Sequence, residues 1–394
     1  LHFTRLLVSL QHKIKKQNMI YKDIHNQERG SMCRYALMQP EGGLAEVHAI
    51  VELEPRGDSF EAQTERLHGA VAEFESTEDM AGMQAVARRF FLSDAVNQKV
   101  KDDGCKCATS FIGQPPLNGS KAAVWIYYVG KDAEVTYEAD EMGSTIVRYK
   151  GLTHVWTMNM MTPEGSSYDQ TQALLNGYEG LLKSKYGTTM EANCVRTWFF
   201  VKDVDTQYKG LVVARKELFE QMGMTPDTHY IASTGIGGTP TIQASLVQMG
   251  CYTLLKENGK VEMKYLYAPT HLNKTYEYGV TFERGTAIGL TERRTTYISG
   301  TASINNRGEV VHVGDVVAQT HRMWENVEAL LKEADMSMDD VMHMVVYLRD
   351  PADYEVVSRL YEQRFPKVPR VISLAPVCRP GWLIEMEVVA GTAE

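Results

Sequence analysis

Apolar residues recur with a helical period at three places in this chain of 394 residues. Each stretch opens on a Gln-Thr pair, and apolar side chains follow the glutamine at offsets of four, eight and eleven residues. The three glutamines are Gln63, Gln170 and Gln319. These offsets put the apolar side chains on one face of a helix, ready to pack on a sheet. A short apolar run then ends in aspartate 31, 33 and 31 residues after the glutamine. The recurrence predicts three related units.

Strand-like runs flank each predicted helix. They precede it at residues 46–53, 144–161 and 295–304, and they follow it at residues 122–129, 245–255 and 383–390. A second helical pattern follows the aspartate in units two and three, whereas residues 94–105 are too short and polar for one. Unit one is therefore the degenerate copy. The pattern predicts an α+β fold with a mixed sheet and two helices on one face of each unit. We expect units at 31–130, 131–258 and 259–394, packed together because no linker rich in Pro, Gly or Ser separates them.

The first thirty residues differ in charge from the rest. They carry six basic and two acidic residues, a net +4, so the formal charge of −9 for the whole chain leaves −13 for the remainder. No small-residue cleavage site follows the apolar stretch 3–10, which argues against a secretory signal. We expect residues 1–30 to be a basic extension outside the fold, either disordered or not native, with Met19 or Met32 as the start. A basic arm with a function of its own is the alternative.

Composition excludes several classes of protein. Hydrophobic residues make up 44% and charged residues 23%, as in ordinary globular proteins. No apolar run approaches the roughly 18 residues of a membrane span, and an acidic body disfavours nucleic acid as a partner. The six cysteines and eleven histidines show no zinc-binding spacing. We therefore expect reduced thiols, a cytoplasmic location, no metal and no cofactor.

The strongest candidate for chemistry lies near the end of the chain. Strand alternation puts Glu385 and Glu387 on one face of an apolar strand, where carboxylates are costly unless they are paired or functional. Arg370, fifteen residues before Glu385, is the expected partner on the neighbouring strand, since an arginine fork binds a carboxylate of the protein or of a ligand. A purely structural ion pair is the alternative. Units two and one have Ser233 with Gln248 and Thr109 with Val124 at these places. Because only unit three keeps the pair, the sequence favours a function.

Two glycine-containing segments and one aromatic segment are further candidates. Residues 233–238 read Ser-Thr-Gly-Ile-Gly-Gly, a run that could present backbone N–H groups to an anion or form a tight turn. Residues 299–303 could form a pocket wall or a strand end. Tyr278, Phe282 and Arg284 could cover a ligand or belong to the core.

Unit three resembles the Rid (reactive intermediate deaminase, YjgF-type) superfamily over about 120 residues. The matching features are Ile298-Ser299-Gly300, the segment 314–320, Tyr347-Leu348-Arg349-Asp350, Arg370 and Glu385-Met386-Glu387. The resemblance implies Rid/chorismate-mutase-like units that assemble as trimers, with ligand sites in clefts between neighbouring units. It implies that Arg370 holds a substrate carboxylate and that Glu385 positions water or moves a proton. Ser299 and Gly300 would line the cleft.

A narrower resemblance, to the chorismatases, extends along the chain. It rests on the segments 298–303 and 233–238, on Thr197-Trp198-Phe199, and on Cys378-Arg379-Pro380 ahead of Glu385. It implies removal of the enolpyruvyl group of chorismate, with Glu385 protonating the methylene carbon. Cys378 would be associated with a hydroxybenzoate product, and Thr234, Gly235 and Thr301 would contact substrate. Because chorismate carries two carboxylates, a second cation is expected, either Arg284 or Arg215.

These expectations combine into one hypothesis with two alternatives. The chain is expected to fold as an intrachain pseudo-trimer, monomeric or in a higher assembly, that cleaves the enol ether of chorismate or a related enol-carboxylate. The first alternative is an imine or enamine deaminase acting on a 2-imino acid. The second is a protein that binds a small carboxylate metabolite without turnover. The ribonuclease label of some family members is disfavoured by the charge of −13 in the body.

Overall fold

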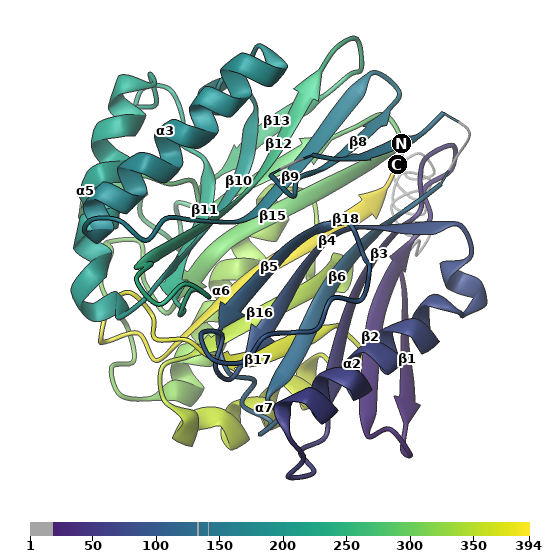
Figure 1. Cartoon of the computed structure of the whole chain (residues 1–394). Helices are drawn as coiled ribbons and strands as arrows, with labels where there is room; N and C mark the ends of the chain where they lie inside the picture. Colours follow the sequence, from purple (N-terminus) through teal and green to yellow (C-terminus); the bar gives the residue numbers. More distant parts are fainter. Residues whose placement is uncertain (1–18, 132–133, 141) are drawn as a thin grey trace, which may run out of the picture.

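The computed structural model describes residues 19–131, 134–140 and 142–394, with the side chain of Tyr278 excepted. These residues form three six-stranded mixed sheets (Figure 1). The sheet orders are β1-β2-β3-β6-β4-β5, β11-β10-β12-β9-β8-β7 and β13-β14-β15-β18-β16-β17. The predicted α+β fold of three tandem units is confirmed. Each sheet contains one parallel pair of strands: β4–β5, β10–β11 or β16–β17. The other neighbouring strands are antiparallel.

Unit one contains β1 (Met19–Asn26), β2 (Ser31–Met38), β3 (Glu46–Leu53), α2 (Phe60–Glu75), β4 (Met83–Leu92), β5 (Ala108–Gly113) and β6 (Ala122–Gly130). Unit two contains β7 (Thr136–Ala139), β8 (Thr145–Tyr149), β9 (Leu152–Met161), α3 (Ser167–Tyr186), α4 (Met190–Asn193), β10 (Cys194–Val201), α5 (Val204–Gln221), β11 (Ala232–Gly237) and β12 (Val247–Lys256). Unit three contains β13 (Glu262–Leu266), β14 (Gly285–Gly289), β15 (Arg293–Ala302), α6 (Val316–Glu333), β16 (Val341–Leu348), α7 (Tyr354–Arg364), β17 (Arg370–Leu374) and β18 (Ile384–Ala393).

The repeated glutamines lock each first helix to the start of the closing strand. In unit one the backbone N–H of Lys121, just before β6, donates to the Gln63 side-chain oxygen at 2.8 Å. Gln170 accepts from Leu246 at 2.7 Å, and Gln319 accepts from Leu383 at 2.9 Å, in each case just before the closing strand. Because an N–H group shielded from water needs a partner, this contact explains why the glutamine recurs in all three units.

The N-terminal boundary expected at residue 31 is wrong. Residues 19–26 form β1, which pairs antiparallel with β2 along its whole length. The Tyr21 hydroxyl also donates to the Val341 carbonyl of unit three at 2.7 Å. The basic extension outside the fold therefore does not reach residue 30, and residues 1–18 lie outside the described part.

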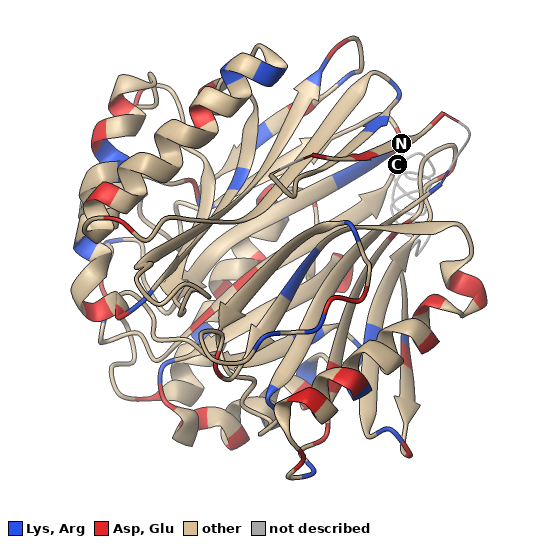
Figure 2. Ribbon diagram, viewed as in Figure 1, with Lys and Arg blue, Asp and Glu red and all other residues tan. Residues whose placement is uncertain are grey.

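Unit one is the degenerate copy, as the sequence predicts. The chain between β4 and β5 contains no helix in the described structure, whereas units two and three have α5 and α7 at this place. The sheets face inward and the helices lie outside (Figure 1). Figure 2 shows that charged residues lie mainly on helices and loops. Among the described residues, no helix combines the length and apolar character that crossing a membrane requires.

The three units pack on one another as a pseudo-trimer. Short backbone bridges join every pair of units: Gly113 with Thr239, Pro116 with Ser373, and Ile236 with Val377. One apolar cluster contains buried side chains of all three units, among them Trp125, Trp156 and Tyr297. The units thus share a core instead of meeting only at polar surfaces.

One buried carboxylate joins all three units inside this core. Glu387 of β18 accepts from Arg89 of β4 and from Arg196 of β10, each at 2.9 Å. The Thr234 hydroxyl donates to the same carboxylate at 2.7 Å. The side chains of all three charged residues are at most 5% exposed. Two arginines and one carboxylate from three units therefore form one ionic cluster shielded from water, and these arginines keep the pKa of Glu387 below its ordinary value.

We predict that Glu387→Gln destabilises the whole chain by about 3–5 kcal/mol, because it leaves two buried guanidinium groups without their counter-charge. Urea unfolding at pH 7 measures the change. The matched control is Glu325→Gln, which removes a surface ion pair to Arg322 with a 3.2 Å separation and should cost less than about 1 kcal/mol. Equal effects of the two substitutions would contradict the central role of Glu387.

Candidate active site

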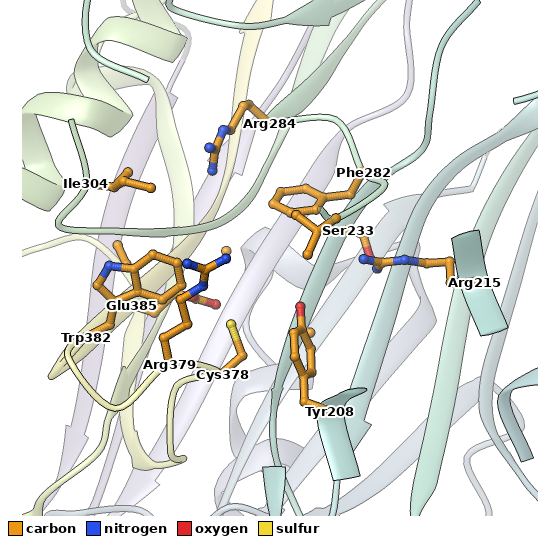
Figure 3. Close-up of a pocket in the computed structure, with 14 residues that line it drawn as sticks. Tyr208, Arg215, Ser233, Phe282, Arg284, Ile304, Cys378, Arg379, Trp382 and Glu385 are labelled. Atoms are coloured by element: carbon orange, nitrogen blue, oxygen red, sulfur yellow. The ribbon is translucent and has the colours of Figure 1, made fainter. Parts of the chain in front are cut away.

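A pocket lies between unit two and unit three (Figure 3). Its empty volume is about 510 Å³, open mouth included. Unit two contributes residues of α5 and β11, and unit three contributes the loop before β14, the end of β15 and the segment that leads into β18. The lining residues are Tyr208, Arg215, Ser233, Gly235, Val280, Phe282, Arg284, Gly300, Ala302, Ile304, Cys378, Arg379, Trp382 and Glu385.

Glu385 is the buried acidic group of this pocket. It is the second residue of β18 and is only 5% exposed. Its carboxylate forms no hydrogen bond or ion pair among the described residues. A Cβ atom at Gly300 would lie 2.1 Å from Glu385 Oε1, so glycine at that position permits the close approach of the carboxylate to the β15 backbone.

The surroundings keep Glu385 protonated. Burial raises its pKa to about 8, and the negative charge of Glu387 adds to this effect. Arg284 and Arg196 act in the opposite direction but do not cancel it. At neutral pH the group is therefore mostly a carboxylic acid that can donate its proton, as a general acid requires.

Three arginines approach the same pocket from different elements (Figure 3). Arg215 of α5 donates to the Ser233 hydroxyl at 3.4 Å, and Arg284 donates to the Asn273 side chain at 3.1 Å. Phe282 lies between them, with its ring centre 5.8 Å from the Arg215 guanidinium carbon and 5.5 Å from that of Arg284. Arg379 stacks over Trp382 at 5.3 Å. Both arginines considered for the second cation thus line the pocket.

Cys378 also lines the pocket, next to Tyr208 (Figure 3). Burial, with a further contribution from the Glu385 charge, raises the pKa of its thiol to about 12. Because the thiolate is the nucleophilic form of cysteine, Cys378 acts in this pocket as a neutral wall group.

Several predicted residues lie behind the pocket wall. Ser299 is fully buried and donates to the Glu283 carbonyl at 2.6 Å. Thr301 donates to the Ser299 carbonyl at 2.9 Å, and Thr234 accepts from the Gly300 N–H at 3.0 Å. These three position the wall without lining the cavity, whereas Gly235, Gly300, Phe282 and Arg284 do line it. The side chain of Tyr278, in the short 3-10 helix Thr275–Tyr278, lies outside the described part.

The predicted pairing of Arg370 with Glu385 is wrong. Arg370 lies on β17, and β16 separates β17 from β18. Register places Arg370 beside Met344 but Glu385 beside Tyr347, three residues further along β16, so the two side chains point to opposite faces of the sheet. Arg370 instead forms an ion pair with Glu362 of α7 and donates to the Val368 carbonyl at 3.2 Å.

One of the three arginines of the pocket, Arg215, comes from a helix of unit two. Ser233 pairs with the residue six before Asp203, as Arg370 pairs with the residue six before Asp350. Arg215 lies twelve residues after Asp203, as Glu362 lies twelve after Asp350. The strand arginine and helix glutamate of unit three thus have a strand serine and a helix arginine as their counterparts. The arginine of this pair is on the strand in unit three and on the helix in unit two, and only the helix arginine, Arg215, lines this pocket among the described residues.

Sequence reasoning did not select some of the lining residues. Arg379 belongs to the Cys378-Arg379-Pro380 motif that carries the family resemblance, so its spacing from Glu385 was a usable signal, whereas Trp382 lies after that motif. Tyr208, in the second helical pattern of unit two, lines the pocket next to Cys378 of unit three. No sequence signal shows that this side chain reaches another unit.

The comparisons with known proteins agree with this architecture. The family model described as endoribonuclease L-PSP matches residues 286–392. The 3-aminoacrylate deaminase RutC of Acinetobacter baylyi is 35% identical over 96 residues, which are 24% of this chain and 76% of that protein. A chorismatase crystal structure is similar to 88% of this chain and 99% of its own, with a TM-score of 0.63 and 19% identity.

The chain belongs to the Rid superfamily. Within it, the three-unit fold is that of a chorismatase, and the predicted resemblance to both groups is confirmed.

We predict that Glu385→Gln makes the protein more stable at high pH. Since the pKa of Glu385 is raised from 4.5 to about 8, its contribution to stability is present below pH 4.5 and is lost as the pH rises to 8. The variant should exceed the parent by about 4 kcal/mol at pH 8 and by less than about 0.5 kcal/mol at pH 4.5. Urea unfolding at the two pH values measures this difference, and the exposed Glu355→Gln serves as the control. A constant difference across pH would contradict the raised pKa.

Proposed function

We propose that this protein removes an enolpyruvyl group from chorismate or a related cyclic enol-carboxylate by acid catalysis. The observation that carries the proposal is a buried, protonated Glu385 in the same pocket as three arginines. A carboxylic acid that keeps its proton at neutral pH can protonate a carbon atom. Cationic side chains around it can hold the carboxylates of such a substrate.

The reaction requires only an acid and water. Glu385 gives its proton to the methylene carbon of the enol ether, which becomes a methyl group, and the neighbouring carbon becomes an oxygen-stabilised cation. Water adds to that carbon and loses a proton to the Glu385 carboxylate, which restores the acid. The resulting hemiketal breaks its bond to the ring oxygen and yields pyruvate and the ring alcohol. Protons and oxygen atoms balance with one water consumed.

The arginines divide between two carboxylates in this proposal. Arg379, beside Cys378 and Trp382, is close in sequence to Glu385 and would hold the carboxylate of the enolpyruvyl group. Arg215 and Arg284, on either side of Phe282, would hold the ring carboxylate across the cleft. The Phe282 ring would supply a flat apolar surface for the ring of the substrate. Cys378, as a neutral thiol, would contact the ring without attacking it.

A second candidate is the hydrolysis of an enamine or imine with one carboxylate. The similarity of unit three to an aminoacrylate deaminase favours it. In that case Glu385 would protonate the enamine carbon, water would attack the iminium carbon, and ammonia would leave. One arginine suffices for such a substrate, so three arginines in one pocket favour the dicarboxylate.

We predict that the protein releases pyruvate from chorismate and that Glu385→Gln lowers kcat by about 10²–10⁴-fold, the usual contribution of a general acid. A continuous pyruvate assay on both proteins measures the effect. Ammonia release from freshly generated iminopyruvate, measured in parallel, tests the second candidate. Absence of pyruvate from the parent protein, or equal rates in the two proteins, would refute the enolpyruvyl proposal.

We predict that Arg379→Met raises KM for chorismate about 10–100-fold, the effect of losing one charge-assisted hydrogen bond. Arg370→Met is the matched control, because Arg370 lies outside the pocket and should leave kcat/KM within about twofold when assayed below the unfolding temperature of each variant. A larger loss for Arg370→Met than for Arg379→Met would restore Arg370 as the carboxylate ligand.

A further inference from the structure

A second hollow lies in unit one, on the side where a second helix is missing. Its empty volume is about 1020 Å³, open mouth included, and it is bordered by α2, β4, β6 and the loop before β5. Units two and three cover the corresponding face of their sheets with α5 and α7. The loss of that helix therefore leaves a hollow that reaches the loop containing Cys105 and Cys107.

Two thiols meet at the edge of this hollow. The Cys105 and Cys107 sulfur atoms are 3.5 Å apart. Cys105 is partly exposed and lines the hollow, whereas Cys107 is only 7% exposed. Neither residue belongs to a strand, so no ladder of backbone hydrogen bonds resists a small movement that would join the two sulfur atoms. Cys105 is thus accessible to solvent and Cys107 is buried next to it. This is the arrangement of an attacking cysteine and a resolving cysteine.

The charges around the pair favour a thiolate at Cys105. Its pKa is lowered to about 6, chiefly by its hydrogen bond with Cys107 and also by the charge of Arg88. Asp103 opposes this shift but is itself bound by Arg88, with Nη2 2.9 Å from Oδ1. Further groups face the pair from α2 and β6. They are His68, whose ring nitrogen is 3.9 Å from Asp103, and Tyr128, whose hydroxyl donates to Glu75 at 2.9 Å.

We propose that Cys105 and Cys107 form a redox-active dithiol that a small hydroperoxide oxidises to a disulfide. The Cys105 thiolate attacks the terminal oxygen of hydrogen peroxide, the O–O bond breaks, and the hydroxide that leaves is protonated to water. The sulfenic acid on Cys105 is then attacked by the Cys107 sulfur, which loses its proton, and a second water leaves. Two thiols and one peroxide thus give one disulfide and two waters, and a thiol reductant reverses the step.

The two cysteines lie directly before β5, a strand that contacts unit two. Cys107 directly precedes β5, and the N–H of Ala108 donates to the Thr145 hydroxyl of unit two at 2.7 Å. Ser110, on the same strand, accepts from the Gln248 side chain of unit two at 2.9 Å. The dithiol is therefore joined to an interface between units through one short strand, apart from the pocket of Glu385.

The sequence supplies a direct test, because Lys106 lies between the two cysteines. The reduced full-length protein is treated with hydrogen peroxide, its remaining thiols are blocked, and it is unfolded and cut with trypsin. We expect fragments 102–106 and 107–121 to stay linked until a reductant separates them. Recovery of the two fragments unlinked after peroxide treatment would overturn the proposal.

Conservative variants separate the two roles. Cys107→Ser should stop at a sulfenic acid on Cys105 that dimedone traps, and Cys105→Ser should leave Cys107 unoxidised. At pH 6 about half of Cys105 is thiolate against ~0.3% of an ordinary thiol, and after allowance for its lower nucleophilicity iodoacetamide should react ~10-fold faster with it than with glutathione. Alkylation of Cys105 no faster than glutathione, or oxidation of Cys107 in Cys105→Ser, would contradict the assignment.

Discussion

The fold depends on one buried carboxylate whose charge is balanced by arginines of the two other units. Glu387 of unit three lies between Arg89 of unit one and Arg196 of unit two, at 2.9 Å from each. An uncompensated charge in such a place costs several kcal/mol, so none of these three units can bury its own member of the cluster alone. The shared apolar core acts in the same direction.

The same cluster also sets the acidity of the candidate site. Thr234 donates to Glu387 and accepts from the N–H of Gly300, whose missing side chain lets Glu385 approach. The charge of Glu387 in turn helps to raise the pKa of Glu385 to about 8. Two carboxylates two residues apart thereby take opposite protonation states. Glu387 stays ionised because it meets two arginines, and Glu385 keeps its proton because it meets none at hydrogen-bonding distance among the described residues.

Local patterns predicted most of the fold, and long-range geometry explains what they missed. The Gln63 motif and its copies give the helices and closing strands, because each glutamine makes a contact repeated in every unit. The strand Met19–Asn26 was missed because only its first residue is buried, so no clear alternation of apolar and polar positions separates it from the basic residues before it. The pairing of Arg370 with Glu385 failed because fifteen residues of spacing do not reveal that β16 lies between their strands. Arg215 and Arg284, the two candidates for a second cation, both line the pocket, which the sequence could not decide because it depends on contact between units two and three.

The residues equivalent to Glu385 in units one and two explain why, among the described residues, only the cleft next to Glu385 resembles an active site. Gln248 occupies the place of Glu385 in unit two, and it donates to Ser110 and Asn159 at 2.9 Å. Sheet register puts Ala123, and not Val124, at this place in unit one. A neutral amide with two partners and a methyl group cannot supply a proton. Only the third copy keeps an acid without a hydrogen-bonding partner, and the neighbouring unit faces it with the helix arginine Arg215. Triplication within one chain thus allows each unit to lose the groups that its own cleft no longer uses, while the scaffold that holds Glu385 remains whole.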